Sequence, residues 1–380
     1  MNKVFTYIKN HGILTCYFKF KAKQILDNRK SPNLFDKLLM KTFHYTKSNK
    51  RKVAIIGTGY FAFSVIGNFL VRYSGASIKY VYDIDKRKQN RFEKFFAIKH
   101  SCNDLDDIKN DREVELVYIA TNHSLHCQYA IEFLRCGKSV HIEKPHVTNN
   151  KQLKMLSQII RTSNCGNIFL GFNRSKSPLF QKIKRADYYD QSLFSLNMNI
   201  IGHKLPNAHW YNKRSEGGRV LGNLTHWIEL IFHFTSTESW PCIITPIRHD
   251  NCNKIIVINF RLQNGSQITL TFSALGETVS GVKEYITYQK GDYNFHCIDF
   301  QKCTVEINGN VVNKNTLRKN LGHQSNIINS YENRIANKEE AMAHVINSAK
   351  LSLLTFYSVV LGRPLNFTPT QLNKTSLPIT

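Results

Sequence analysis

Two glycines one residue apart interrupt the chain directly after a short apolar run. Residues 53–56 form this run and suit a buried parallel strand, Gly57 and Gly59 follow it, and residues 63–71 have the pattern of a helix. In such a turn the first glycine permits the bend, the second lets a pyrophosphate approach the backbone, and the helix N-terminus attracts its charge. We therefore predict a dinucleotide-binding turn whose contacts are Gly57, Thr58, Gly59, Tyr60 and Phe61.

An acidic residue closes the next predicted strand, residues 78–82. Asp83 lies about 20 residues past the glycine turn, where a carboxylate accepts hydrogen bonds from the ribose of NAD and repels the 2′-phosphate of NADP. Lys86, Arg87 and Lys88 follow and oppose that repulsion, so NAD is the expected cofactor and NADP stays open. The alternative interpretation is that Asp83 is only a turn residue or the N-cap before the next helix.

Alternating strands and helices over residues 51–145 must position these groups. Strands are predicted at 115–120 and 139–142, and helices at 86–96 and 124–136. Such alternation predicts a doubly wound parallel sheet, the Rossmann type, which binds ligands beyond the carboxyl ends of its strands. Thr121 and Lys144 both stand at such ends.

The second half of the chain has a different pattern. Apolar residues alternate over 194–200, 256–262 and 268–272, and Asn264-Gly265 between the last two runs is a strong hairpin signal. This predicts a mainly antiparallel open sheet, followed by a long apolar-faced helix at 341–361. The expected fold is α/β followed by α+β, with a helical extension at 1–50, a nucleotide domain at 51–172 and a substrate domain at 173–380.

Composition narrows the class of protein. The chain has 380 residues, of which 42% are hydrophobic and 12% aromatic, enough for more than one core. The nine cysteines are scattered singly without a C-x-x-C pair, which favours reduced thiols over a disulfide framework, and we expect no metal site. Neither a run of 18 apolar residues nor a signal peptide is recognised, so a cytoplasmic protein is expected.

The net charge of +25 is concentrated towards the start of the chain. Residues 1–52 hold 13 Lys and Arg against two acidic residues. A basic surface serves nucleic acid, an anionic membrane or an anionic ligand, or is only solvated, and no nucleic-acid motif is present. Residues 1–50 are expected to form two short amphipathic helices that pack on the body of the protein. Contact with a membrane surface is the less favoured alternative.

Together these residues resemble the Gfo/Idh/MocA family of oxidoreductases over about residues 51–365. The similarity is closest to members encoded with bacterial surface-polysaccharide genes, which share His209-Trp210 and stretches such as Lys283-Glu284, Asp299-Phe300 and Gly322-His323. It rests on motifs in the family's order: Gly57-Thr58-Gly59 with Ala62; Thr121-Asn122-His123 with His126; Glu143-Lys144-Pro145; Gly171-Phe172-Asn173-Arg174; and Gly217-Gly218-Arg219 leading through Gly222-Asn223 to His226.

The resemblance implies hydride transfer between a nicotinamide and a secondary hydroxyl of a sugar, with a nucleotide-sugar in polysaccharide biosynthesis as the favoured substrate. Lys144 and His226 would be catalytic, the histidine as base and the lysine polarising the oxygen. A homo-oligomer through the open sheet is also implied. Further cofactor contacts would be Thr121, Asn122, His126, Glu143 and Lys144, and substrate contacts Asn173, Arg174, His209, Trp210, Arg219 and Asn223.

The chain departs from the family pattern near the histidine. Gly222 stands where many members have an acidic residue, and Asn223 where the closest members often have Glu. An amide cannot relay a proton. A non-catalytic NAD-binding scaffold or regulator therefore remains the rival interpretation, in which His226 is only a core histidine.

Overall fold

The structure is a computed structural model that resolves the chain into two compact units. The parallel-sheet unit comprises Gly12–Gly171 and Gln324–Val345, and the mixed-sheet unit comprises Met1–His11, Phe172–His323 and Ile346–Thr380. Each unit is described separately. The residues described are 2–27, 30–46, 51–161, 165–184, 193–206, 208–247, 254–275, 281–316 and 318–370.

Five parallel strands form the sheet of the first unit, in the order β2-β1-β3-β4-β5. Their cores are almost fully buried because helices cover both faces. The strands are β1 (Lys52–Ile56), β2 (Ile78–Tyr82), β3 (Val114–Ile119), β4 (Ser139–Ile142) and β5 (Ile168–Leu170). The Rossmann-type sheet expected from the alternation is confirmed.

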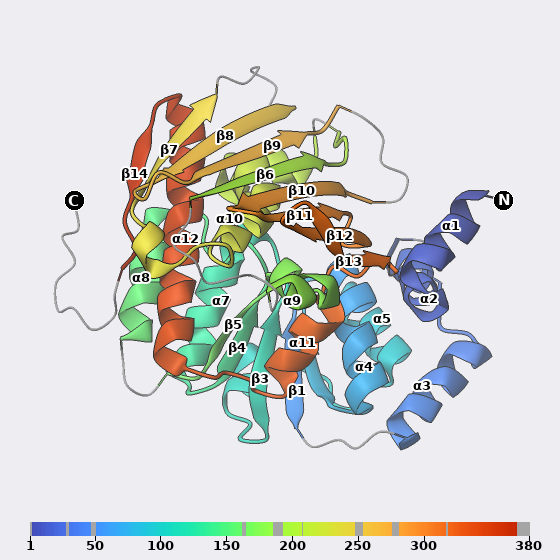
Figure 1. Ribbon diagram of the computed structural model, residues 1–380. Helices are drawn as coiled ribbons and strands as arrows, with labels where there is room; N and C mark the ends of the chain where they lie inside the picture. Colours follow the sequence, from blue (N-terminus) through green and yellow to red (C-terminus); the bar gives the residue numbers. More distant parts are fainter. Residues whose placement is uncertain are drawn as a thin grey trace. The chain divides into compact units, whose positions relative to one another are not determined.

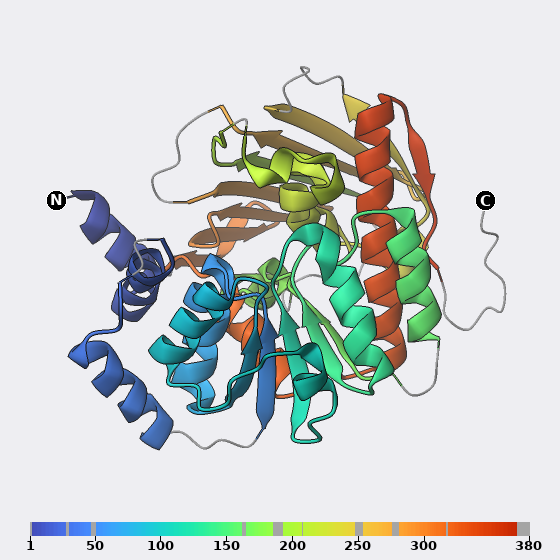
Figure 2. The same cartoon turned by 180° about the vertical axis from the view of Figure 1, so that it is seen from behind.

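The helices of this unit lie on opposite faces of the sheet. In Figures 1 and 2, α4 and α11 lie on one face and α7 and α8 on the other. The helices are α4 (Asn68–Ser74), preceded by a wide helical turn at Ala62–Gly67, α5 (Lys86–Phe96), α6 (Leu105–Lys109), α7 (His123–Arg135), α8 (Asn150–Ile160) and α11 (His323–Tyr331). The Tyr118 hydroxyl donates to the Ile327 carbonyl at 2.9 Å, which fixes α11 to β3.

An additional helical layer precedes β1. It consists of α2 (Ile13–Ala22), the wide turn Lys23–Asp27 and α3 (Leu34–Thr46), and α1 (Asn2–His11) precedes it in the other unit. Phe18, Ala22, Ile25, Leu26 and Met40 are buried in the same cluster as Val53 and Phe63. The expected packing on the body is confirmed for α2 and α3, but the segment forms more helices than the two predicted.

Phe18 is the centre of this layer. Its ring is fully buried and lies 5.9 Å from Phe95 and 6.1 Å from Phe96, measured between ring centroids. Phe18→Ala should lower the free energy of unfolding by about 3–5 kcal/mol, because it removes a large buried ring. Urea unfolding measures the loss. Phe20→Ala, on the same helix but exposed, is the control and should change stability by less than about 0.5 kcal/mol. Equal effects of the two substitutions would contradict an integral layer.

Nine strands form the sheet of the second unit, in the order β13-β12-β11-β10-β6-β9-β8-β7-β14, and only the pair β6–β9 is parallel. Arg261 pairs with Gln267 across the predicted Asn264-Gly265 hairpin. The strands are β6 (Phe194–Ile201), β7 (Cys242–Ile247), β8 (Ile255–Leu262), β9 (Gln267–Ser273), β10 (Lys283–Lys290), β11 (Tyr293–Ile298), β12 (Lys302–Ile307), β13 (Asn310–Thr316) and β14 (Leu365–Phe367). The mainly antiparallel sheet predicted for the second half is confirmed.

One face of this sheet packs against helices. Trp227, Ile228 and Ile231 of α10 (Thr225–Ile231) share a core with the inward residues of β6, β8 and β9. The unit also holds α9 (Pro178–Lys184) and most of α12 (Lys338–Leu361). Among the described helices α12 alone is long and apolar enough to cross a membrane by length and composition, but 61% of its most apolar window is buried inside the protein, as in a core helix.

Candidate active site

The glycine turn lies between the ends of β1 and β3. Gly57 has a φ of +89°, and a Cβ there would come within 2.5 Å of the Ala120 carbonyl oxygen, so only glycine fits. A Cβ on Gly59 would meet nothing within 4 Å. The space beside Gly59 is therefore open, and the helix that begins at the turn points its first N–H groups towards it, as a pyrophosphate requires. Tyr60 is exposed and Phe61 half-buried at the same turn.

Asp83 ties the end of β2 to this turn. Its Oδ2 accepts hydrogen bonds from the Thr58 backbone N–H at 2.7 Å and from the Thr58 hydroxyl at 2.8 Å. The cap of α5 is instead Asp85, whose Oδ1 accepts from the N–H groups of Arg87 and Lys88. Asp83 is therefore not the N-cap of α5, but it does form a turn before that helix, because its Oδ1 accepts from the Asp85 N–H at 2.9 Å. Its carboxylate lies at the carboxyl edge of the sheet where the ribose site was expected.

Lys86, which could have weakened the preference for NAD, has other partners. Its Nζ donates to Gln89 Oε1 at 3.0 Å and to the Cys102 carbonyl at 3.3 Å, and lies 4.4 Å from the centre of the Tyr82 ring. Lys86 is thus engaged by partners other than Asp83.

From this geometry we predict that NAD binds at least about tenfold more tightly than NADP. Asp83→Asn should reduce that ratio, because it removes the charge that repels a 2′-phosphate. Thr58→Ala is the matched control: it removes a partner of Asp83 and should weaken both cofactors without changing their ratio. Quenching of protein fluorescence measures both affinities, and tighter binding of NADP by the wild type would contradict the assignment.

The ends of β3 and β4 are braced by His126. Its Nδ1 lies 2.9 Å from the Pro145 carbonyl oxygen and its Nε2 3.0 Å from that of Thr121. Burial lowers the pKa of His126, so the ring is neutral and donates to one carbonyl at a time. The ring is fully enclosed, and this geometry supports a positioning role rather than the direct cofactor contact predicted. Thr121 is half-buried and Asn122 exposed at the start of α7.

Glu143 and Lys144 follow β4 at the same edge. The Glu143 carboxylate is buried against Gly171, where a Cβ would come within 2.7 Å of it, and Oε1 lies 3.4 Å from His141 Nε2. The next residue, Lys144, is half-buried. The parallel sheet thus brings Gly57, Asp83, Thr121 and Lys144 to one edge, each from a neighbouring strand.

In the mixed-sheet unit Arg174 belongs to a buried ion network. Its Nη2 lies 3.0 Å from Glu284 Oε1, and its guanidinium lies 5.0 Å from the centre of the Trp227 ring. Trp227 Nε1 donates to Glu284 Oε2 at 2.7 Å. Asn173 is also buried and donates to the Leu321 carbonyl at 2.6 Å. Since both side chains are enclosed by protein partners, this geometry does not support the substrate contacts predicted for Asn173 and Arg174.

The network continues through residues that the sequence did not assign to any role. Asp299 Oδ1 accepts from the Glu284 N–H at 2.8 Å, and Lys283 and Lys319 lie 2.9 and 3.3 Å from its carboxylate oxygens. The signal for them was the likeness of Lys283-Glu284 and Asp299-Phe300 to the family. Their role is to fix β10 and the start of α10, which carries His226.

A second group of polar residues lies at the helical turns that lead into the helix of His226. Arg219 donates to the His203 carbonyl at 2.8 Å and to Asn223 Oδ1 at 3.3 Å. Burial lowers the pKa of Arg219, and burial together with Arg219 lowers the pKa of His209. His209 stacks on Trp210, 5.8 Å between centroids.

His226 is buried in α10, with its ring 6.2 Å from Phe172. The helical turns run on from Val220–Leu224 into α10, so His226 lies inside a helix rather than before one. Gly222 and Asn223, four and three residues earlier, share a helix face with it. Lys144 and His226 belong to different units, and the role proposed for each rests on its own surroundings.

Comparison with known proteins supports the first domain most directly. Residues 51–172 match the model of the Gfo/Idh/MocA oxidoreductase family, described as having an NAD-binding Rossmann fold. This match confirms, for residues 51–172, the resemblance to the Gfo/Idh/MocA family and the predicted NAD-binding Rossmann fold.

The curated relatives are distant. Oxidoreductase P35 of Formosa agariphila is 27% identical over 203 residues, which cover 48% of this chain and 61% of the relative. Inositol 2-dehydrogenase of Salmonella typhimurium is 23% identical over 253 residues, covering 65% and 70%. An uncharacterised oxidoreductase of Streptococcus pneumoniae is 25% identical and covers 47% of each chain. The chain therefore spans about half to three fifths of the length of the first relatives it matches.

Solved structures share the fold over most of the chain. A levoglucosan dehydrogenase in complex with NADH has a TM-score of 0.68 at 14% identity, covering 85% of this chain and 100% of that one. GenD2 from gentamicin A biosynthesis, in complex with NAD, has a TM-score of 0.68 at 16% identity, covering 85% and 97%. At these identities the likeness shows the two-part fold.

Proposed function

We propose that this chain is an NAD-dependent oxidoreductase that transfers a hydride between nicotinamide and a secondary hydroxyl of a sugar. The observation that carries the proposal is the edge of the parallel sheet, where the Thr58–Asp83 hydrogen bonds hold the glycine turn and Lys144 follows the nearby strand β4. The glycine turn and the Lys144 cation thus follow strands at the same edge of the sheet, which supports the proposal. The dehydrogenases of inositol and levoglucosan among the similar proteins support a polyhydroxylated substrate.

The side chains divide the chemistry between them. NAD⁺, when bound, accepts the hydride from the carbinol carbon. As that C–H bond breaks, the hydroxyl proton leaves to a base and the alcohol becomes a ketone, and the base is the role we propose for His226. For Lys144 we propose the hydrogen bond that polarises the reacting oxygen. In the reverse direction Lys144 polarises the carbonyl and His226 returns the proton. His126 holds the strand end that precedes Lys144, and the Arg174–Glu284–Trp227 network holds the helix of His226.

Several aromatic and polar residues of the mixed-sheet unit suit a sugar. Aromatic rings at His209, Trp210 and Tyr211 offer faces on which a sugar ring packs, and Arg219 with Asn223 offers hydrogen-bond donors. We propose a nucleotide-sugar of polysaccharide biosynthesis as the substrate, because the net charge of +25 attracts a diphosphate.

We also propose a cytoplasmic location, the three domains at 1–50, 51–172 and 173–380, and a homo-oligomer formed through the open sheet.

The rival function is a cofactor-binding scaffold whose catalytic site has decayed. What favours it is Asn223, which stands where the closest family members often have Glu and accepts a hydrogen bond from Arg219. In this alternative NAD binds and nothing is turned over.

Screening for NADH formation separates the two functions. The full-length protein would be incubated with NAD and a panel of inositols, sugars and nucleotide-sugars, and absorbance would report reduction. Turnover of one substrate class supports the enzyme. Tight NAD binding with no turnover in either direction on any substrate supports the scaffold, and failure to bind NAD or NADP overturns both.

A further inference from the structure

The outer surface of the N-terminal layer is apolar. On α3 the exposed side chains follow helical spacing and form one stripe, and α2 has a second stripe. The large exposed apolar residues of the two helices are Ile13 (73% exposed), Leu14 (37%), Phe20 (58%), Leu34 (73%), Phe35 (60%), Leu38 (54%) and Tyr45 (91%). Exposed apolar residues gathered in this way on one layer mark a contact surface.

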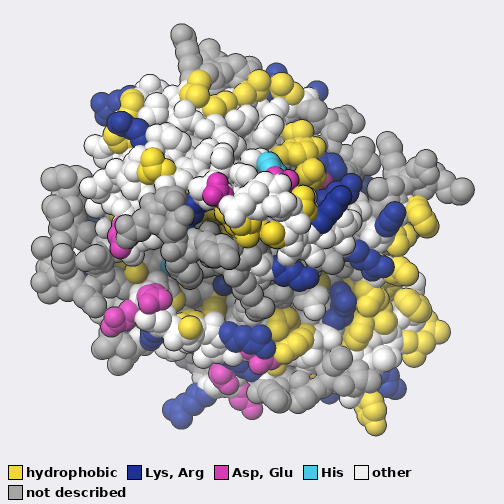
Figure 3. Space-filling view, in the orientation of Figure 1, with side chains coloured by type: hydrophobic (Ala, Val, Ile, Leu, Met, Phe, Trp, Pro, Cys, Tyr) yellow, Lys and Arg dark blue, Asp and Glu magenta, His cyan; other side chains and the backbone are white. Residues whose placement is uncertain are grey.

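The two stripes belong to one surface. Tyr17 of α2 meets Phe35 of α3 edge-to-face, with ring centroids 5.8 Å apart. Lys21 of α2 forms a buried ion pair with Asp36 of α3 at 2.9 Å. These contacts fix the helices to one another, and Figure 3 shows hydrophobic side chains over α2 and α3 with Lys and Arg among them.

Basic residues accompany the apolar ones. Lys37 and Lys41 lie on the exposed side of α3 between Leu34, Leu38 and Tyr45, and Lys23 is exposed at the end of α2. Among the described residues of α2, α3 and their connection, Asp27 is the one exposed acid, because Asp36 is buried in its ion pair. An apolar stripe with lysines along it matches an anionic bilayer, which accepts both.

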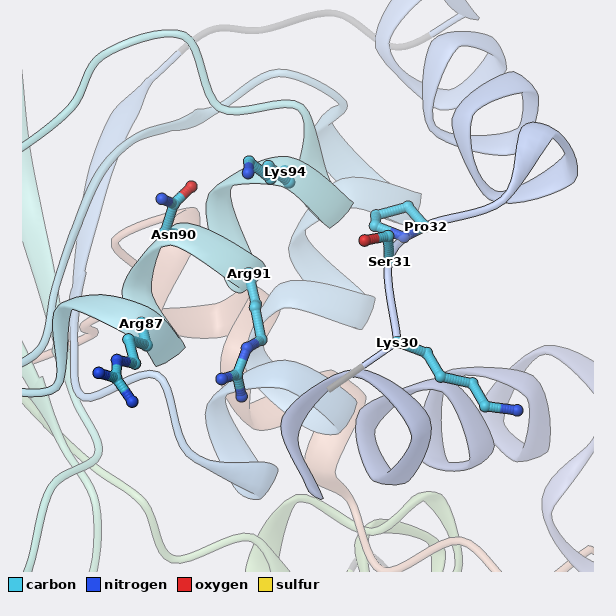
Figure 4. Close-up of a pocket in the computed structure, with 7 residues that line it drawn as sticks. All are labelled: Lys30, Ser31, Pro32, Arg87, Asn90, Arg91 and Lys94. Atoms are coloured by element: carbon cyan, nitrogen blue, oxygen red, sulfur yellow. The ribbon is translucent and has the colours of Figure 1, made fainter. Parts of the chain in front are cut away.

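A basic pocket adjoins this surface. It has a volume of about 290 Å³ and lies between α5 and the segment that leads into α3. Figure 4 shows Arg87 and Arg91 extending to the same side of α5, and Arg91 donates to the Leu26 carbonyl at 3.1 Å. Guanidinium groups recognise phosphate oxygens. The lining residues are Lys30, Ser31, Pro32, Arg87, Asn90, Arg91 and Lys94.

We propose that α2 and α3 dock this protein on an anionic membrane surface, with the basic pocket taking a phospholipid headgroup. A second copy of the chain fits this surface less well, because a self-complementary contact would bring Lys37 and Lys41 of the two copies together. The sequence alone favoured packing on the body over membrane contact. In the structure the inner side of the layer enters the core, and its outer side carries the apolar and basic residues on which the membrane proposal rests.

Co-sedimentation of the full-length protein with lipid vesicles tests the proposal. Wild type should bind vesicles of phosphatidylcholine with 30% phosphatidylglycerol and should not bind phosphatidylcholine alone. Removing Lys37 and Lys41 (Lys37→Gln with Lys41→Gln) should weaken binding roughly 25-fold, about fivefold per lysine. Phe20→Gln with Leu34→Gln and Leu38→Gln should weaken it at least about tenfold.

A matched control uses exposed apolar residues of the other unit, Val311→Gln with Val312→Gln, and should leave vesicle binding unchanged. Unchanged NAD affinity shows that each variant is folded. Should the apolar triple variant not fold, the lysine pair still decides the question. Three results would overturn the proposal. The first is that the wild type fails to bind anionic vesicles, and the second is that the Val311/Val312 control loses as much vesicle binding as the α2 and α3 variants. The third is that the wild type is a dimer that the lysine or apolar variants dissociate.

Discussion

Lys144→Ala should still bind NAD but lose turnover by about 100-fold or more, because polarisation of the substrate oxygen contributes at least that much. Lys144 follows β4 while the glycine turn follows β1, so shortening its side chain leaves the turn intact. Steady-state kinetics on the substrate found by screening, with NAD titration by fluorescence, separates the two effects. Lys151→Ala, at an exposed lysine of α8, is the matched control and should retain full activity.

His226→Ala should reduce turnover by a similar factor. It should also remove the part of the pH dependence of kcat that is due to the histidine. If the variant keeps the pH profile of wild type, His226 is a core residue and not the base.

Asn223→Glu supplies the acid that the family pattern has near this position. If the wild type is a slow enzyme, Asn223→Glu should raise its rate. If both proteins bind NAD but turn over no substrate, the result supports the scaffold.

Glu284→Gln should lower the free energy of unfolding by about 3–5 kcal/mol, because it leaves the Arg174 guanidinium buried without its charge partner. Trp227 also loses the carboxylate to which its indole donates, so its fluorescence should change even below the unfolding transition. Urea unfolding and emission spectra measure the two effects.

The paired variant Arg174→Met with Glu284→Leu distinguishes a broken ion pair from a poorly packed core. It removes both charges, and it should recover part of the stability lost in Glu284→Gln. A loss below about 1 kcal/mol in Glu284→Gln would contradict the network as the support of α10.

The sequence was sufficient to predict the elements that obey short-range rules. The apolar run and glycines at 53–59 specify a strand and a turn, and Asn264-Gly265 specifies a hairpin, because each pattern has one favourable backbone solution. Sheet order could not be read in the same way. β14 pairs with β7 and β6 with β9, and these contacts join segments far apart in the chain.

The site was predictable as a set of positions and less so as a set of roles. The positions of Lys144 and Asp83 were predictable because each follows the carboxyl end of a predicted parallel strand, where ligands bind. Arg174 is a charged residue beside a family motif, which suggests ligand contact, yet its partner Glu284 comes 110 residues later and buries it. Likewise the sequence predicted that the extension containing Phe18 packs on the body, but nothing near Phe18 in the sequence identifies Phe95 and Phe96 as the residues that pack against it.

The return of residues 324–345 to the parallel-sheet unit has a consequence for synthesis on the ribosome. Ile327 and Tyr331 complete the core that β1, α4 and β3 begin, but they are translated after the strands β6 to β13. At about 5–20 residues per second, roughly 8 to 30 s pass between the end of β5 and the emergence of α11. During that interval the nucleotide unit carries an open apolar face, so chaperone binding to nascent chains should be strongest before residue 331 appears and fall once α11 has docked.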